Sequence, residues 1–296
     1  VLEKSNCCKH AERVYCFPVK SGNFASDTSN HLPGENHCRA LNTSAMILRT
    51  LALLLLSFTF MTACKDNDEP VNRDNFTVTF KVLYDGQPLE KYVNYPYGDK
   101  YIMFDKFNTY LSDLTLLKGA EEVKLSDIEW VDFTPDFAPD DKAVAVSYKY
   151  TVPDGDYTGV KIGYGVRPDL NAKKPADFPV GHPLYLENEY WSGWKSYIFT
   201  KIQGEFDVDG DNSTDTNIFY HCGSDAVYNT ATMDRDIRVS GNGSLEIEFD
   251  LKKLFTFNGQ LLDLTVPANQ VTSHDASNIA LGQKIMSNFK NATLLQ

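Results

Sequence analysis

The nine residues FTVTFKVLY, 76–84, lead directly into the pair Asp85-Gly86. Apolar and polar side chains mostly alternate along them, and a period of two places the apolar set on one face of an extended strand. Asp-Gly readily forms the tight turn of a β-hairpin, because both residues tolerate a left-handed backbone. The stretch therefore predicts a half-buried β-strand that ends in a turn.

Stretches of the same kind recur along the rest of the chain. They are rich in β-branched and aromatic residues and are separated by glycine, proline and aspartate. We expect turns at Asp105 and Asp113 within the first of them, and at the glycines of residues 241–243 within the last. They occupy residues 101–117, 123–133, 143–152, 157–166, 194–208, 216–222 and 236–251. Many short strands with turn signals at this spacing predict an all-β fold, either a sandwich or a barrel.

Short helices are expected only near the C-terminus. Residues 273–289 place several apolar side chains near one helical face, with Ser273 or Asp275 available as a cap. The stretch LKKLF, 251–255, suits a single helical turn. We therefore predict a single antiparallel β-sandwich domain over residues 76–290, with a short C-terminal helix.

The N-terminal part of the sequence contains an export signal. Residues 46–63 begin with a methionine and hold an apolar run that is too short to span a membrane comfortably. They end at MTAC, 61–64, which resembles a bacterial lipobox with Met61 in place of the usual leucine. We expect cleavage before Cys64 and lipidation of Cys64, with an ordinary secretory signal as the alternative. Residues 1–45 would then be a non-native upstream extension, although their four cysteines also suit a zinc or disulfide module.

Charge and composition indicate where the protein resides. Residues 64–75 are charged and contain Pro70, which predicts a flexible tether. Their acidic run resembles the signal that sends Bacteroidetes lipoproteins to the outer face of the outer membrane. We expect a surface-exposed outer-membrane lipoprotein held only by its lipid, with the periplasmic face as the alternative. The net charge of −12 repels nucleic acid, which we exclude as a partner.

Four segments, in this order and at this spacing, resemble the MbnP-like family. The most specific parts are the aromatic segment that leads to Gly204 and Glu205, and the histidine before Gly223. Members of this family are exported copper-associated β-proteins related to the methanobactin-associated periplasmic partner. The segments are FDKFNTYLSDLTLL (104–117), YTGVKIGYGVRPDLN (157–171), YWSGWKSYIFTKIQGEFD (190–207) and IFYHCGSD (218–225).

The resemblance implies a β-sandwich that binds copper, as Cu⁺ or Cu²⁺, through histidines. In some members a tryptophan near the metal is oxidised to kynurenine by a dihaem peroxidase-like partner. His221 matches the histidine of the family, and Trp191 and Trp194 match its tryptophan segment. Cys222 stands where the family often has a leucine, which adds a soft candidate ligand.

Strand geometry limits how these residues combine. On a regular strand His221 and Cys222 point to opposite faces, so they share one ion only if the strand ends at Gly223. A buried inert thiol is the alternative for Cys222, and a hydrogen-bonded core histidine is the alternative for His221. We expect Trp194 to pack inward as core and Trp191, at the edge of a loop, to border a site.

Two further histidines follow the leader. His182 lies between two prolines in PVGHPLY, which predicts a loop, and His274 precedes the C-terminal helix, where it would also serve as a cap. If both approach His221, the three form a copper site. A solvated loop histidine and a capping histidine are the alternatives.

The acidic stretch DVDGDNSTD, 207–215, resembles a calcium-binding loop. Its carboxylates stand at positions 1, 3, 5 and 9 of such a loop, where Ca²⁺ takes oxygen ligands. Position 12 is Ile218 rather than the usual glutamate, so an acidic hairpin loop is the alternative. The carboxylates belong to Asp207, Asp209, Asp211 and Asp215.

The sequence contains no nucleotide-binding loop, no dinucleotide fingerprint, no nucleophile elbow and no zinc-protease motif. We therefore expect a non-enzymatic protein, and the family resemblance implies that it binds or traffics copper. The alternative is a binding module for a glycan or a partner protein, because exposed flat rings stack on sugars. The aromatic residues for that role are Tyr92, Tyr95, Tyr97, Tyr101, Tyr185, Tyr190 and Trp191.

Overall fold

The computed structural model of the protein describes residues 74–136, 140–272 and 279–296, all within one compact unit, Asp68–Gln296. The predicted leader, the predicted lipidation site Cys64, most of the predicted tether and the candidate ligand His274 lie outside these residues. In the described part of the chain, no helix is long and apolar enough to span a bilayer.

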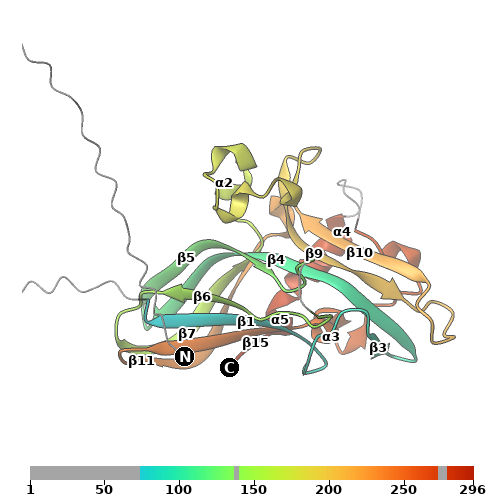
Figure 1. Ribbon diagram of the computed structural model, residues 1–296, viewed down its shortest axis with the longest axis horizontal. Coiled ribbons are helices and arrows are strands. Elements are labelled where there is room, and N and C mark those ends of the chain that lie inside the picture. Colours follow the sequence, from blue (N-terminus) through green and yellow to red (C-terminus); the bar gives the residue numbers. More distant parts are fainter. Residues whose placement is uncertain (1–73, 137–139, 273–278) are drawn as a thin grey trace, which may run out of the picture. The chain divides into compact units, whose positions relative to one another are not determined.

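Two β-sheets form the predicted sandwich, and Figure 1 shows β4, β9 and β10 in a layer above β1 and β15. The smaller sheet has the order β15-β12-β1-β2, with β6 also paired to β1. Its strands are β1 (Phe76–Tyr84), β2 (Gln87–Pro88), β6 (Val146–Tyr150), β12 (Gly243–Asp250) and β15 (Thr293–Leu295).

The larger sheet has eight strands around the long central strand β4 (Lys100–Lys118). Its main order is β10-β9-β4-β7-β11, while β3 and β5 also pair with β4 and β8 pairs with β9. The other strands are β3 (Asn94–Tyr97), β5 (Glu121–Asp132), β7 (Gly155–Tyr164), β8 (Tyr190–Trp191), β9 (Ser196–Phe206), β10 (Thr216–Gly223) and β11 (Asn229–Val239). A separate hairpin joins β13 (Thr256–Phe257) to β14 (Gln260–Leu261).

The all-β sandwich is confirmed, with one departure from purely antiparallel pairing. β1 and β12 run parallel over eight residue pairs, from Phe76 opposite Gly243 to Leu83 opposite Asp250. Parallel neighbours need a crossover connection, because a hairpin cannot join them. Here most of the larger sheet lies between the two strands in the sequence, so the chain supplies that connection.

The predicted turns at Asp105 and Asp113 are wrong, because β4 runs through both positions without a break. The register shifts instead, between Phe104 and Lys106 on the β9 side and between Ser112 and Thr115 on the β7 side. Asp113 has a φ of 52°, a conformation that aspartate tolerates better than most residues. The two aspartates therefore mark β-bulges, which kink a strand without ending it.

A core of buried aromatic side chains joins the two sheets. Phe107 of β4 stacks on Phe133 at a ring-centroid distance of 5.1 Å and meets Phe249 of β12 edge-on at 6.3 Å. Phe289, from the C-terminal segment, contacts Phe249 at 6.0 Å. The predicted helical turn and C-terminal helix are present as α3 (Leu251–Leu254) and α4 (Ile279–Ser287), and α5 (Phe289–Ala292) follows.

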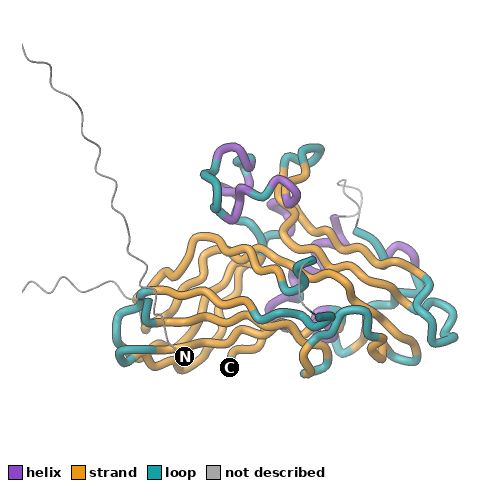
Figure 2. Tube along the Cα trace, viewed as in Figure 1, coloured by secondary structure: helices purple, strands orange, loops and turns teal. Residues whose placement is uncertain are grey.

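A segment of short helices, residues 168–189, crosses the outer face of the larger sheet; Figure 2 shows its helical turns beside the strands. The Tyr110 hydroxyl donates a hydrogen bond to the Pro183 carbonyl at 3.0 Å, and the Tyr197 hydroxyl donates to that of Leu184 at 2.8 Å. These two bonds fix the segment over β4 and β9. It contains α2 (Pro168–Asn171), η1 (Pro175–Asp177), η2 (Pro183–Tyr185) and η3 (Glu187–Glu189); η4 (Asp225–Val227) and η5 (Pro267–Asn269) lie elsewhere.

Candidate functional site

His221 lies on β10 at the end of a row of polar side chains that crosses four strands. Residues directly opposite on neighbouring strands project from the same face of a sheet. Because Phe107 packs into the core, its neighbour Asn108 and the rest of the row lie on the outer face. In order from β5 to β10 the row consists of Asp132, Asn108, Lys201 and His221.

The half-buried imidazole of His221 contacts a neighbouring amide. Its Nε2 lies 2.6 Å from the side-chain amide nitrogen of Gln203, so the two groups are within hydrogen-bond distance. The backbone N–H of His221 donates to the Thr272 hydroxyl at 2.7 Å. Thr272 belongs to a short segment that runs beside β10, where Phe219 N–H donates to the Gln270 carbonyl at 3.0 Å. A neutral imidazole is the form that binds metal ions.

Cys222 is buried and packs toward Gly282 of α4; its Sγ lies 3.8 Å from the position that a Cβ on Gly282 would occupy. Burial raises the pKa of the thiol to about 12, so it stays protonated at neutral pH. Metals bind the thiolate, and reactive cysteines have lowered rather than raised pKa values. The environment therefore matches the buried inert thiol, which is the alternative weighed for this residue.

Trp194 shares a small cavity with His221 and Cys222. The cavity has a volume of about 10 Å³, and Thr272, Ile279 and Gly282 also line it. A volume of this size holds about one water molecule. Trp194, which we expected to be core, therefore borders this cavity, and Trp191 does not line it.

Trp191 is 37% exposed and stands on the two-residue strand β8, opposite Ser196. Its indole Nε1 lies 2.7 Å from where a Cβ on Gly193 would be, so the ring folds over its own turn. Strand alternation misled the prediction, because β9 begins only at Ser196 and Trp194 lies in the turn before it.

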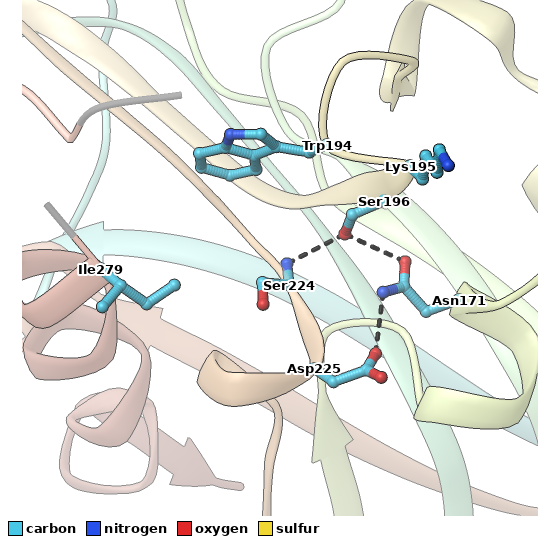
Figure 3. A pocket seen from close by; sticks show the side chains of 7 residues that line it. All are labelled: Asn171, Trp194, Lys195, Ser196, Ser224, Asp225 and Ile279. Carbon is cyan, nitrogen blue, oxygen red and sulfur yellow. Dashed lines mark hydrogen bonds between the residues drawn. The ribbon is translucent and has the colours of Figure 1, made fainter. Parts of the chain in front are cut away.

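A larger pocket, of about 290 Å³, opens beside Trp194 (Figure 3). Its floor is a chain of hydrogen bonds centred on the buried side chain of Asn171. The Asn171 amide donates to Asp225 at 2.8 Å, and its oxygen accepts from the Ser196 hydroxyl at 3.1 Å and from Tyr197 N–H at 2.9 Å. Ser224 N–H donates to the same serine hydroxyl at 2.9 Å.

Two residues that line this pocket hold unusual backbone conformations. Ser224 has φ 93° and ψ 145°, a region that residues other than glycine rarely adopt, and Lys195 has φ 55°. Strained conformations gather at functional sites. Sequence reasoning did not identify Asn171, Ser196 and Asp225 as site residues. Asn171 and Asp225 are the last residues of two family-like segments, and this position was the only feature of the sequence that we used which could have indicated them.

His182 is placed in a structural role within the crossing segment. Its Nδ1 accepts the Leu184 N–H at 3.1 Å as the N-cap of η2, and its ring stacks on Phe178 at 4.5 Å. Partial burial lowers its pKa, which keeps the ring neutral. Within residues 74–136, 140–272 and 279–296, no set of three ligand side chains joins His182 with His221, and His274 lies outside the described residues.

The acidic loop does bring three carboxylates together. Single oxygens of Asp207, Asp209 and Asp211 lie within 4.8 Å of one another. The fully buried Asp207 accepts Gly210 N–H at 2.6 Å and Asn212 N–H at 3.2 Å, and Asn212 has the left-handed φ of 74° that suits position 6. Asp215 instead accepts Val208 N–H at 3.2 Å. Ile218 is buried and supplies no twelfth-position ligand.

The aromatic rings considered for glycan binding do not form one exposed surface. Tyr92, Tyr185 and Trp191 are 60%, 39% and 37% exposed, on three different parts of the chain. Tyr97 is buried and donates its hydroxyl to the Leu262 carbonyl at 2.6 Å. Tyr95 is half-buried and packs on Tyr84 at 4.6 Å.

The fold and the site define a β-sandwich protein with a histidine and a tryptophan around one cavity beside the larger sheet. A model of the MbnP family matches residues 73–278. The chain belongs to the MbnP family, as the four segments of its sequence indicate.

A search of the curated proteins found no match. Among solved structures, the chain is similar to MbnP from Methylosinus trichosporium, with 14% sequence identity and a TM-score of 0.47. The similarity covers 74% of this chain and 96% of that protein.

Proposed function

We propose that this chain is a non-enzymatic copper-binding or copper-trafficking protein, exported and anchored by a lipid on Cys64 at the cell surface. Membership of the MbnP family supports the metal, and the lipobox-like MTAC supports the anchor. The observation that carries the proposal is the placement of His221 and Trp194 around one small cavity. A dihaem peroxidase-like maturation partner belongs to the same proposal, because it would supply the oxidation of the tryptophan.

The side chains available as metal ligands decide whether the site can bind copper. In the part of the chain that the structure describes, the site offers one imidazole, from His221, while the thiol of Cys222 is protonated and His182 caps η2. Copper needs at least one further nitrogen or sulfur ligand. His274 is the remaining histidine after the leader, and it lies outside the described residues. The proposed ligands are therefore His221 and His274, with Trp194 as the ring to be oxidised.

Replacing His221 by alanine is expected to weaken copper binding by at least about 100-fold, because even partners of metal ligands contribute 10- to 100-fold. The matched control is His182→Ala, which removes a second imidazole outside the cavity and should change the affinity less than about threefold. Affinity is measured on the mature protein by competition with a chromogenic copper chelator. Equal affinities of the wild type and His221→Ala, or wild-type protein that takes up no copper, would exclude the site.

Mass spectrometry of protein from the native host tests the rest of the proposal on the same sample. Fragment ions distinguish Trp191 from Trp194, and the proposal requires that any oxidation to kynurenine falls on Trp194. The N-terminal peptide reports whether Cys64 carries a lipid. Modification of Trp191 alone would place the metal elsewhere.

The second proposal is that the loop of Asp207, Asp209 and Asp211 binds Ca²⁺ weakly. The supporting observation is the close approach of the three carboxylates, one of them fully buried. Addition of 5 mM Ca²⁺ is expected to raise the midpoint of thermal unfolding, since a ligand that binds only the folded state stabilises it. The Asp209→Asn variant should lose that increase, whereas 5 mM Mg²⁺ should produce little, because Mg²⁺ dehydrates reluctantly. If Ca²⁺ leaves the unfolding midpoint unchanged, the loop does not bind calcium and is only an acidic hairpin loop.

A further inference from the structure

A second pocket lies on the outer face of the larger sheet, at the other end of the polar row from His221. Its volume is about 700 Å³, within the range of roughly 300–1,000 Å³ for small-molecule sites. The floor consists of side chains from β4 and β5 and includes Asn108, Trp130 and Asp132. The crossing segment forms the wall, with residues 185–189.

Asn108 lines this pocket, and its side chain holds an unmet hydrogen-bond acceptor. The residue is only 1% exposed, and its Oδ1 has no hydrogen-bond partner. A buried amide oxygen without a partner costs stability, and native proteins rarely keep one without a reason. A ligand that donates a hydrogen bond would remove the cost.

The charges of the pocket show what kind of donor would suit it. Lys106 pairs with Asp136 at 3.1 Å, and Lys201, from the polar row, pairs with Glu189 at 2.8 Å. Two lining carboxylates then remain without an ion pair in the described chain, those of Asp132 on the floor and Glu187 on the wall.

Asp132 is the carboxylate that faces the unmet amide. It lies directly opposite Asn108 in the β4–β5 register. Burial raises its pKa, more than the hydrogen bond from the Thr134 N–H and the nearby ammonium groups of Lys106 and Lys201 lower it. Among the described residues, the floor thus offers a neutral amide oxygen without a partner beside a carboxylate that has no ion pair and accepts only the Thr134 N–H, at 3.1 Å.

Aromatic and apolar surface lines the rest of the pocket. Trp130 is half-buried and rests on Tyr110 at a ring-centroid distance of 4.5 Å, while Tyr185 is 39% exposed at the wall. Ring faces attract cations and also cover the hydrocarbon part of a ligand. Leu186, 38% exposed, extends the apolar wall.

We propose that this pocket binds a primary ammonium group on a short apolar stem, with Asp132 and the Asn108 amide oxygen as acceptors and Trp130 and Tyr185 around the stem. The ammonium group can belong to a small free amine or to a lysine side chain of a peptide, which share this chemistry. The proposal is independent of copper, because it uses different residues.

The test is a calorimetric titration of the mature protein with 1,5-diaminopentane, with 1,5-pentanediol as the uncharged match. A second arm uses acetylated Gly-Lys-Gly amide against its acetyl-lysine counterpart. Saturable binding of the free amine, the lysine peptide or both is expected, without binding of the diol or the acetyl-lysine peptide. Asp132→Asn should weaken binding at least tenfold, whereas Asp225→Asn, a carboxylate of the other pocket, should change it less than twofold. Binding of the diol as tight as that of the amine, or Asp132→Asn with full affinity, would overturn the proposal.

Asn108→Leu separates a ligand-binding role from a structural one. If the amide oxygen serves a ligand, an apolar side chain of similar size removes the buried unmet acceptor, and the unfolding midpoint should rise by about 2–4 °C while amine binding is lost. A lower midpoint together with unchanged amine binding would assign the side chain to the fold and overturn the proposal. If the variant does not fold, the Asp132→Asn titration still decides.

Discussion

Gly204→Ala is expected to lower the free energy of unfolding by more than about 4 kcal/mol, a loss reserved for a few severe mechanisms. A Cβ on residue 204 would lie 1.9 Å from the Met103 carbonyl oxygen and 3.0 Å from Cα of Phe104. Both contacts are with the backbone of β4, which pairs with β9 and β7 along one edge and with β3 and β5 along the other. β4 therefore cannot shift away from β9, and the clash must break hydrogen bonds between these two strands.

The measurement is urea unfolding followed by circular dichroism, with Gly282→Ala as the matched control. A Cβ at residue 282 of α4 would meet Val227 at 3.6 Å and the Cys222 sulfur at 3.8 Å, which are ordinary packing distances. The control should be neutral or gain up to about 1 kcal/mol, because alanine favours helix over glycine. Equal losses of unfolding free energy in the two variants would show that the close approach of β4 and β9 is not the reason why residue 204 must be glycine. The expected contrast also gives a physical reason for the glycine in the family-like segment 190–207.

Local patterns predicted the strands well and their partners poorly. The alternation of residues 76–84 gives β1 with both ends correct, and Asp85 and Gly86 adopt φ values of 51° and 76°, as a tight turn requires. A period of two, however, carries no information on the neighbouring strand or its direction. The parallel pairing of β1 with β12 and the bulges of β4 depend on contacts between distant residues, so the sequence pattern could not reveal them.

The sequence pattern likewise predicted only part of the candidate site. His221 and Cys222 are adjacent on β10, but the strand ends at Gly223 with a register shift after Cys222, and both residues line the small cavity. Alternation failed for Trp191 and Trp194, because a turn with a left-handed Lys195 precedes β9. The row from Asp132 to His221 could not be predicted at all, since it appears only when the register of four strands is known.

Asp250→Ala is expected to destabilise the protein by about 4 kcal/mol, from the loss of a helix cap and of two further hydrogen bonds to a buried charge. The carboxylate is 1% exposed. Its Oδ1 accepts the N–H groups of Asp85 at 3.1 Å and Lys252 at 3.0 Å, and its Oδ2 accepts that of Gly86 at 3.0 Å. One side chain thus joins the turn after β1 to the start of α3, and alanine would remove the buried acceptor that these donors share.

Two variants measured by the same urea unfolding test this explanation. Asp250→Asn keeps one acceptor oxygen but loses the charge and the second acceptor, so its loss should be about half that of alanine. Asp263→Ala removes an exposed aspartate whose Oδ1 accepts the Thr265 N–H at 3.0 Å, and should cost less than about 1 kcal/mol, because its partners reach water. A small loss in Asp250→Ala would mean that water replaces the carboxylate. Because Asp250 lies in the smaller sheet, away from His221, the variant should keep its copper affinity wherever it remains folded, which separates stability from metal binding.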